Sequence, residues 1–204
     1  MELNNLKTII KNLEAYECKL LAVVKNQNIE NIKKLVDFGV NDLGENRLDE
    51  LIEHSQNIPN QNFHFIAPIQ SRKLPEILKH SVGIHSVFRK KELDIISKNY
   101  NHQELFVQVN VDGDKNKSGL NVEQLFEFIE YAKGLNIMPK GLMCIPNIAS
   151  DRQVVFSKMQ YINEQLKNEF QDYQGELSMG MSDDYEIALD YGATIVRIGS
   201  KIFL

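Results

Sequence analysis

The sequence LLAVVK, residues 20–25, consists of five apolar residues followed by a lysine. A continuous apolar run of this length is typical of a strand that is covered on both faces, as in a parallel sheet. The segment after it carries Ile29, Ile32 and Leu35 at helical spacing before a glycine ends the pattern. The stretch therefore predicts a strand followed by a helix, with Lys25 at the carboxyl end of the strand.

The same alternation recurs along the chain. Strands are expected near residues 20–24, 41–44, 63–66, 83–87, 105–109, 140–145, 177–179 and 194–198. Eight strands alternating with helices predict an α/β protein built as a single (β/α)8 TIM barrel over residues 1–204. The competing architecture is an open doubly wound sheet, which usually carries a glycine-rich phosphate loop after its first strand. Because no such loop follows residues 20–24, the barrel is favoured.

The two ends of the chain add a further expectation. The sequence stops at Leu204, just past the eighth strand, so no helix is expected to cover that strand from its own side. The amphipathic segment from Leu3 to Tyr16 could fill the gap. We therefore expect an extra N-terminal helix outside the barrel, beside the eighth strand.

Composition limits the classes of function. The net charge of -5 disfavours a protein that binds the phosphate backbone of nucleic acids. The chain has neither an apolar signal region nor the roughly 18 consecutive apolar residues that a membrane helix needs. Cys18 and Cys144 lie far apart and are expected to be reduced core thiols, and His64 and His85 lack further ligands at metal-binding spacing. These features predict a cytoplasmic protein without a metal site.

Functional residues of a barrel gather at the carboxyl ends of its strands. Lys25 is expected there, where partial burial would favour the uncharged amine that attacks an aldehyde to form a Schiff base. Ser182 follows the seventh strand, and Gly199 and Ser200 follow the eighth. Loops after these two strands are the recurrent phosphate site of such barrels. The alternatives are a lysine that simply leaves a strand for solvent, and glycines and serines that only shape turns and caps.

Two acidic residues complicate the proposed phosphate site. Asp183 and Asp184 precede the helix that follows the seventh strand, and carboxylates at a helix N-terminus would compete with a phosphate. We therefore expect both carboxylates to point away from the ligand.

Several motifs fall in the order that they have in a known family. They are AVVK (22–25), DLGEN (42–46), HFI (64–66) with QS (70–71), IHSV (84–87), VQVN (107–110) with KSG (117–119), GLM (141–143), LSMGMSDD (177–184) and VRIGS (196–200). Together they closely resemble the pyridoxal phosphate homeostasis protein family, the single-domain relatives of the alanine racemase N-terminal-domain barrel. The resemblance covers the chain from Leu20 to Phe203.

The resemblance implies that the cofactor is pyridoxal 5′-phosphate, held as a Schiff base on Lys25. It also implies the roles of the remaining site residues: Asn46 lines the pocket, Arg197 faces the pyridine nitrogen, and Ser182, Gly199 and Ser200 hold the phosphate. The sequence departs from the family at the rim, where Arg47 stands in place of a common aromatic residue and Arg72 in place of a common asparagine.

Two classes of function remain open. The resemblance implies a monomeric carrier that stores, protects and delivers the cofactor in vitamin B6 homeostasis, with pyridoxal-phosphate-dependent apo-enzymes as possible recipients. The alternative is an enzyme of the amino-acid racemase type, which needs a second acid/base on the opposite face of the cofactor. The two-domain racemases supply that group from beyond the barrel. An arginine at the pyridine nitrogen only donates hydrogen bonds, which makes the ring a poorer electron sink. We therefore expect a carrier without enzyme activity; a barrel for another phosphorylated molecule is a third possibility.

Overall fold

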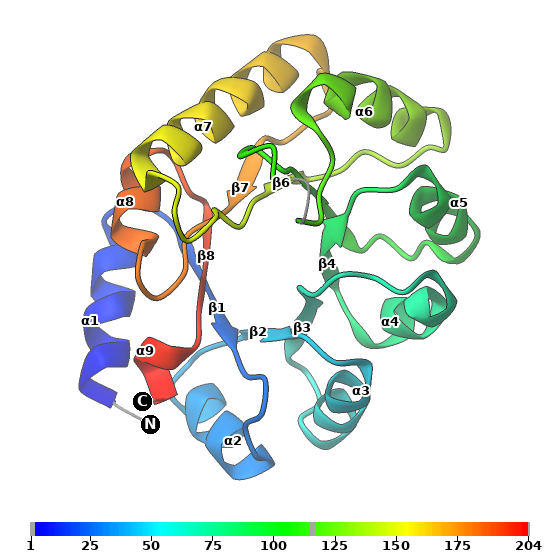
Figure 1. Ribbon diagram of the computed structural model, residues 1–204. Coiled ribbons are helices and arrows are strands. Elements are labelled where there is room, and N and C mark those ends of the chain that lie inside the picture. Colours follow the sequence, from blue (N-terminus) through cyan, green and yellow to red (C-terminus); the bar gives the residue numbers. More distant parts are fainter. Residues whose placement is uncertain (1–2, 115–116, 204) are drawn as a thin grey trace.

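Eight parallel strands close into a barrel in the computed structural model, which describes residues 3–114 and 117–203 (Figure 1). The strands are β1 (Lys19–Val23), β2 (Asp42–Glu45), β3 (Asn62–Phe65), β4 (Gly83–Val87), β5 (Glu104–Gln108), β6 (Gly141–Met143), β7 (Glu176–Ser178) and β8 (Ile195–Ile198). Each strand pairs with the next, and β8 pairs with β1, with Leu21 opposite Arg197. The closed ring confirms the (β/α)8 barrel and rules out the open doubly wound sheet.

Helices surround the barrel (Figure 1). They are α1 (Leu3–Glu14), α2 (Ile29–Asp37), α3 (Leu48–Asn57), α4 (Leu74–His80), α5 (Lys90–Asn99), α6 (Leu125–Gly134), α7 (Arg152–Glu169), α8 (Tyr185–Asp190) and α9 (Ser200–Phe203), with single 3₁₀ turns η1 (Ser71–Lys73) and η2 (Val122–Gln124). The apolar stripe that predicted α2 is the buried face of that helix, with Ile32 and Leu35 fully buried. Asn28 caps this helix by accepting from the backbone N–H of Asn31.

The observed strands begin and end within two residues of the expected ranges. The largest difference is β6, which ends at Met143 because the following residues leave the barrel as a loop that reaches α7 at Arg152. Of the expected 1–204 domain, residues 1–2, 115–116 and 204 lie outside the described part of the chain.

The N-terminal helix packs where the sequence predicts, although α1 ends at Glu14 and not at Tyr16. Its buried face consists of Leu6, Ile9 and Leu13, and it contacts α9 and β1. Polar bonds at its carboxyl end reach α8, since Asn12 Nδ2 donates to Tyr185 Oη at 3.3 Å. Figure 1 shows α1 beside α8 and α9 on the outside of the barrel.

The expectation that no helix follows the eighth strand is wrong. A single turn, α9, begins at Ser200 directly after Gly199, and the backbone N–H of Ile202 donates to the Gly199 carbonyl at 2.9 Å. Its fully buried residue, Ile202, contributes to the same core as α1. The seam between β8 and β1 is therefore covered jointly by α1 and α9.

The barrel interior combines apolar and polar side chains. Leu21, Phe106, Met143 and Ile195 form a small buried cluster inside the ring, separate from the large core between strands and helices. His85, Ser178 and Arg197 are buried as well, with exposed fractions of 0%, 0% and 4%. Buried polar groups need hydrogen-bond partners, so these three are expected to be hydrogen-bonded within the protein.

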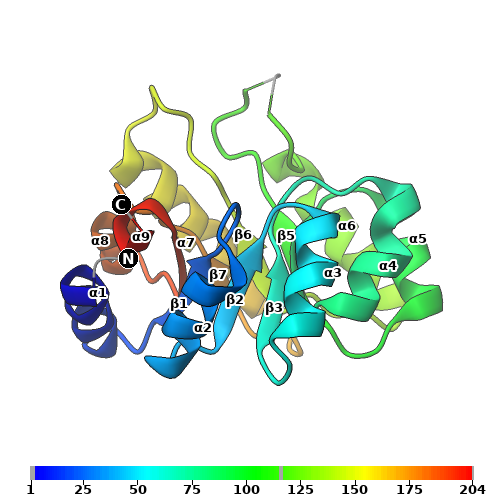
Figure 2. The same ribbon diagram turned by 90° about the horizontal axis from the view of Figure 1, so that it is seen from below.

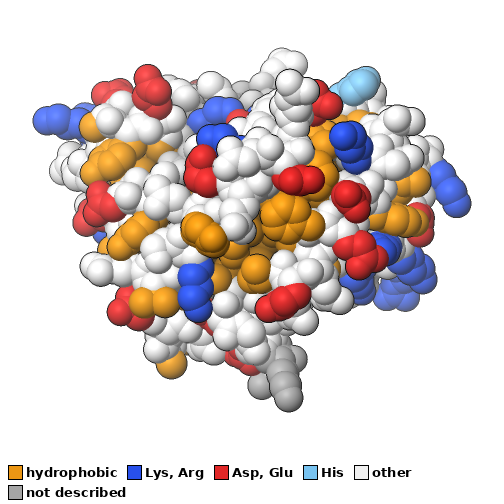
Figure 3. All heavy atoms as spheres, turned by 90° about the horizontal axis from the view of Figure 1, so that it is seen from above, with side chains coloured by type: hydrophobic (Ala, Val, Ile, Leu, Met, Phe, Trp, Pro, Cys, Tyr) orange, Lys and Arg blue, Asp and Glu red, His pale blue; other side chains and the backbone are white. Residues whose placement is uncertain are grey.

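Outside the barrel, charges of both signs are mixed. Figure 3 shows the side of the molecule formed by α6 and α7, where acidic and basic side chains are interspersed among apolar ones. Val154 and Tyr161 of α7 are among the exposed large apolar side chains.

Candidate functional site

The carboxyl ends of the strands lie on one face of the molecule. The loops after β5 and β6 rise above the barrel on this face (Figure 2). The tip of the second loop exposes Ile148, and Arg152 ends this loop as the first residue of α7. The predicted site residues all come from strands or loops that open onto this face.

Lys25 lies at the predicted end of β1, but its surroundings differ from the expectation. The strand ends at Val23, and the chain turns at Lys25 and Asn26, where Asn26 adopts a left-handed φ of 59°. The side chain of Lys25 is exposed, so the expected partial burial is wrong. The turn carries the lysine past the last hydrogen-bonded residues of the sheet, which leaves its amine open to an incoming aldehyde.

The loops after β7 and β8 meet beside the end of β1. The backbone N–H of Lys201, in the first turn of α9, donates to Ser182 Oγ at 3.4 Å. Ser200 is exposed at the start of the same turn. A Cβ added to Gly199 would lie 3.1 Å from the carbonyl oxygen of Val23, so β8 passes close to β1 at this point. The structure thus places two hydroxyls and the start of α9 around one small region beside the end of β1.

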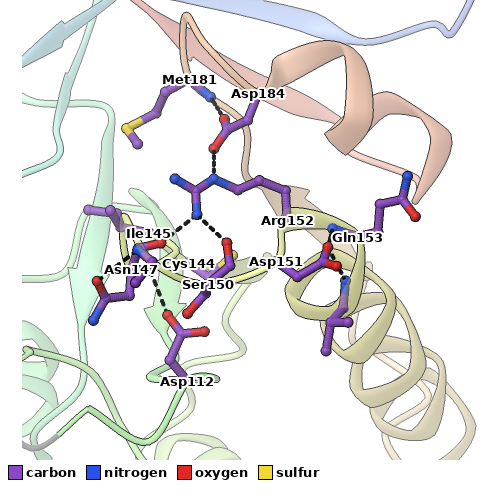
Figure 4. A network of polar contacts seen from close by, with 12 residues as sticks. Asp112, Cys144, Ile145, Asn147, Ser150, Asp151, Arg152, Gln153, Met181 and Asp184 are labelled. Atoms are coloured by element: carbon purple, nitrogen blue, oxygen red, sulfur yellow. Dashed lines mark hydrogen bonds and ion pairs between the residues drawn. The ribbon is translucent and has the colours of Figure 1, made fainter.

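Asp183 is exposed, and Asp184 is buried and faces Arg152. Arg152 Nε lies 2.8 Å from Asp184 Oδ2, while Asp184 Oδ1 accepts the backbone N–H of Met181 at 2.7 Å. Figure 4 shows Arg152 between the loops after β6 and β7, with its guanidinium also donating to the carbonyls of Asn147 and Ser150. The Asp184 carboxylate is occupied by these contacts. Arg152, which the sequence did not single out, ties the two loops together.

The loop after β6 is fixed on its other side as well. The backbone N–H of Asn147 donates to Asp112 Oδ2 at 2.6 Å (Figure 4). The side-chain amide of Asn147 donates to Asp114 Oδ2 at 2.7 Å. These bonds link it to the loop after β5. The loops after β5, β6 and β7 therefore form one connected rim.

Arg197 occupies the middle of β8 and points into the barrel. Its Nη1 donates to the Ser178 carbonyl at 2.5 Å and to Ser178 Oγ at 2.9 Å, and its Nη2 donates to the Cys144 carbonyl at 2.8 Å. Burial lowers the pKa of Arg197, but a guanidinium remains protonated in proteins. The residue is therefore a fixed cation beneath the strand ends.

Asn46 directly follows β2, whose Gly44 is paired with Val23 of β1. Its Oδ1 is buried and makes no hydrogen bond with the described residues, which is the state expected of a group that awaits a ligand. Asn46 also borders a pocket of about 550 Å³ between α3 and α4, lined in part by Gln70 and Lys73. Register places Asn46 beside the Lys25 turn.

Arg47 and Arg72, the two residues at the rim that differ from those common in the family, have different surroundings. Arg47 is exposed and pairs with Asp49 at 2.7 Å and with Glu50 at 3.3 Å. Glu50 in turn accepts the backbone N–H of Asn26 at 2.9 Å, so Arg47 supports the loop that carries Lys25. Arg72 is exposed in η1.

The site has chemical features that suit a phosphorylated aldehyde. An exposed amine lies at the end of β1, and two hydroxyls and the backbone of a helical turn lie beside it. A buried guanidinium lies below, and the amide oxygen of Asn46 makes no hydrogen bond with the described residues. A phosphate suits the hydroxyls and backbone N–H groups. An aromatic nitrogen suits a donor that cannot lose its proton.

Comparison with known proteins identifies the family. The family described as "Alanine racemase, N-terminal domain" matches residues 3–204. A pyridoxal phosphate homeostasis protein of Aquifex aeolicus is 35% identical over 195 residues, which cover 91% of this chain and 86% of that protein. Another, from Corynebacterium glutamicum, is 32% identical, and the match covers 90% of this chain and 88% of that protein. The chain belongs to the pyridoxal phosphate homeostasis protein family.

Solved structures agree with this membership in the pyridoxal phosphate homeostasis protein family. PipY of Synechococcus elongatus without PLP superposes with a TM-score of 0.91 at 27% identity, and PipY with PLP bound with 0.88 at 25%. Both matches cover 98% of this chain and 99% of PipY. An arginine decarboxylase of Paramecium bursaria Chlorella virus, at 18% identity and a TM-score of 0.73, shares the fold alone. Among the described residues, no helix has the length and apolar character needed to cross a membrane.

Proposed function

We propose that this protein binds pyridoxal 5′-phosphate covalently through Lys25 and serves as a carrier of that cofactor in vitamin B6 homeostasis. The observation that carries the proposal is the convergence of the Ser182 and Ser200 loops, joined at Lys201, beside the end of the strand that leads to Lys25. PipY, which has the same fold over its whole length, has been solved with PLP bound.

Each predicted residue has a task that its position supports. Lys25 would hold the cofactor as a Schiff base, and Ser182, Gly199 and Ser200 would receive its phosphate, with Gly199 keeping side-chain atoms out of the approach. Arg197 would donate to the pyridine nitrogen. Asn46, whose side-chain oxygen makes no hydrogen bond within the described part of the chain, would line the pocket. The bound group would supply an aldehyde that can be passed to another amine.

A carrier is favoured over an enzyme by Arg197. A permanently protonated neighbour keeps the pyridine nitrogen unprotonated, which weakens the electron withdrawal that amino-acid chemistry on this cofactor requires. The curated relatives are named homeostasis proteins, in agreement with this choice. Pyridoxal-phosphate-dependent apo-enzymes would be the recipients.

We propose that the carrier acts as a monomer in the cytoplasm. Cys18 and Cys144 are both buried and unpaired, as suits a reducing compartment. Molecular mass in solution, with and without cofactor, tests the monomer directly.

Borohydride reduction of the protein saturated with the cofactor tests the attachment site. We expect the Schiff-base absorption to disappear on reduction and a cofactor-sized mass to remain on the peptide that contains Lys25. Lys25→Arg should abolish both signals, because a guanidinium cannot form the bond. Lys19→Arg is the matched control, since Lys19 is an exposed lysine at the opposite end of the same strand. A label on another lysine, or none at saturation, would contradict the proposal.

A further inference from the structure

A continuous row of polar side chains crosses the inside of the barrel. It begins at Asp42 near the amino ends of the strands and runs through His64, His85 and Ser178 to Arg197. The successive contacts are Asp42 Oδ1 to His64 Nε2 at 3.2 Å, His64 Nδ1 to His85 Nε2 at 3.1 Å, His85 Nδ1 to Ser178 Oγ at 2.8 Å, and Ser178 Oγ to Arg197 Nη1 at 2.9 Å. The five residues come from β2, β3, β4, β7 and β8.

The two ends of this row fix the direction of its hydrogen bonds. Arg197 has donors only, so Ser178 Oγ accepts from it and can direct its own proton to His85 Nδ1. A neutral His85 then carries its proton on Nε2, which donates to His64 Nδ1. His64 in turn carries its proton on Nε2 and donates to Asp42, whose carboxylate only accepts. Every bond in the row points from Arg197 towards Asp42.

Burial of His85 supports the neutral state that this direction requires. The pKa of His85 is held well below its usual value, first by burial and also by the positive charges of Arg197 and Lys140. The ring of His85 also stacks on Phe106, with centroids 4.2 Å apart, so it cannot turn freely away from its two partners.

The far end of the row reaches solvent. A pocket of about 460 Å³ opens at the amino ends of the strands, and Asp42 and His64 form part of its wall. The charged groups around this mouth include Lys19 and Glu104. Glu104 pairs with Lys140 and is not part of the row. Of the two carboxylates at this mouth, Asp42 therefore belongs to the hydrogen-bonded row and Glu104 does not.

We infer that Asp42, His64, His85 and Ser178 are positioning residues for Arg197, acting as one directed hydrogen-bond chain between the two mouths of the barrel. The chain orients the Ser178 hydroxyl and thereby the guanidinium that, in the proposed function, faces the cofactor. A change at Asp42 therefore alters the cofactor's surroundings at the opposite end of the barrel. The inference rests on the proposed function only for the role of Arg197 towards the pyridine ring.

The first test uses the protein without cofactor. Nitrogen NMR of the imidazole rings distinguishes protonated from unprotonated ring nitrogens. We expect both His64 and His85 to be neutral, with the proton on Nε2. Asp42→Asn should convert His85 from this single tautomer to a mixture, because an amide can donate as well as accept. Ser178→Ala should do the same from the other end.

The matched control is Glu104→Gln, which removes one carboxylate charge from the same mouth but breaks no bond of the chain. It should leave the His85 tautomer unchanged. A proton on His85 Nδ1 in the unaltered protein, or equal effects of Asp42→Asn and Glu104→Gln, would overturn the chain.

The second test adds pyridoxal 5′-phosphate. Asp42→Asn should shift the absorption maximum of the bound cofactor, and Glu104→Gln should not, although both substitutions lie at the opposite mouth. Normal cofactor binding with an unchanged spectrum in Asp42→Asn and Ser178→Ala would refute the positioning role and leave the proposed function intact. Failure of the unaltered protein to bind the cofactor would instead refute the proposed function, while the ring tautomers in the free protein would still decide on the chain.

Discussion

Ser200 is the residue at which the phosphate site can be tested most cleanly. Gly199 is less suitable, because a Cβ there would meet the Val23 carbonyl oxygen at 3.1 Å and disturb the seam between β8 and β1. Ser200 is exposed, so Ser200→Ala should leave the fold unchanged and remove one hydroxyl donor. We expect affinity for pyridoxal 5′-phosphate to fall about tenfold, the scale of one hydrogen bond to a charged group.

The measurement is a comparison of two ligands. Pyridoxal lacks the phosphate, so its affinity should be the same in Ser200→Ala as in the unaltered protein. An equal loss for both ligands would show that Ser200 acts on something other than the phosphate.

His85 determines part of the dependence of stability on pH. Because burial depresses its pKa, the unfolded chain takes up a proton below about pH 6.5 that the folded protein does not bind. The contribution of His85 to the free energy of unfolding is fully present above that pH. It falls as the pH drops, by up to about 1.4 kcal/mol per pH unit. Urea unfolding at pH 7 and pH 5 should therefore show a smaller difference in His85→Gln.

The control for this prediction is His102→Asn. His102 is exposed and has a left-handed φ of 60°, which asparagine tolerates. Its removal should leave the pH dependence intact. If His85→Gln loses as much stability between pH 7 and pH 5 as the unaltered protein, the ring does not resist protonation in the fold.

At the scale of the elements, α1 acts as part of the barrel wall. Leu6→Ala should lower the free energy of unfolding by roughly 2–5 kcal/mol, because its fully buried side chain would leave a cavity over the seam of β1 and β8. Lys7→Ala, next to it on the exposed face, should stay within about 0.5 kcal/mol. Urea titrations of both variants measure the difference, and similar values for the two would show that α1 adds nothing to the core.

The elements were largely predictable because the strands of a (β/α)8 barrel are covered on both faces and several of them are short apolar runs, as in Leu20 to Val24. The exact ends of the strands were not predictable, because the last residue of β6 depends on where the neighbouring strands β5 and β7 end. The Lys25 and Gly199 regions follow from the rule that sites lie at strand ends. The exposure of Lys25 depends on the turn at Asn26, which no local sequence pattern predicted. The one-turn helix α9 was missed because four residues are too short for a periodic signal.

The internal hydrogen-bond chain belongs to the scale of the whole molecule. His64 and His85 are separated along the sequence by an entire helix, and Ser178 lies more than half the chain away from Asp42. Only closure of the barrel brings these residues into contact. The sequence predicts that the two histidines are structural and are not metal ligands, but no spacing rule could connect them to Arg197.

The whole protein should therefore bind its cofactor without turning over amino acids. Arg197 donates to the Ser178 and Cys144 carbonyls, which hold its guanidinium beneath the strand ends. Its permanent charge keeps the pyridine nitrogen unprotonated and the bound cofactor a weak electron sink. The test incubates the cofactor-loaded protein with single enantiomers of alanine in deuterated water and follows chirality and α-proton exchange, with Lys25→Arg as the blank. We expect both rates to remain far below the ~1 s⁻¹ of ordinary enzymes. Racemisation at or above that rate would require a protonated pyridine nitrogen or an acid/base elsewhere in the site, and would make the protein an enzyme.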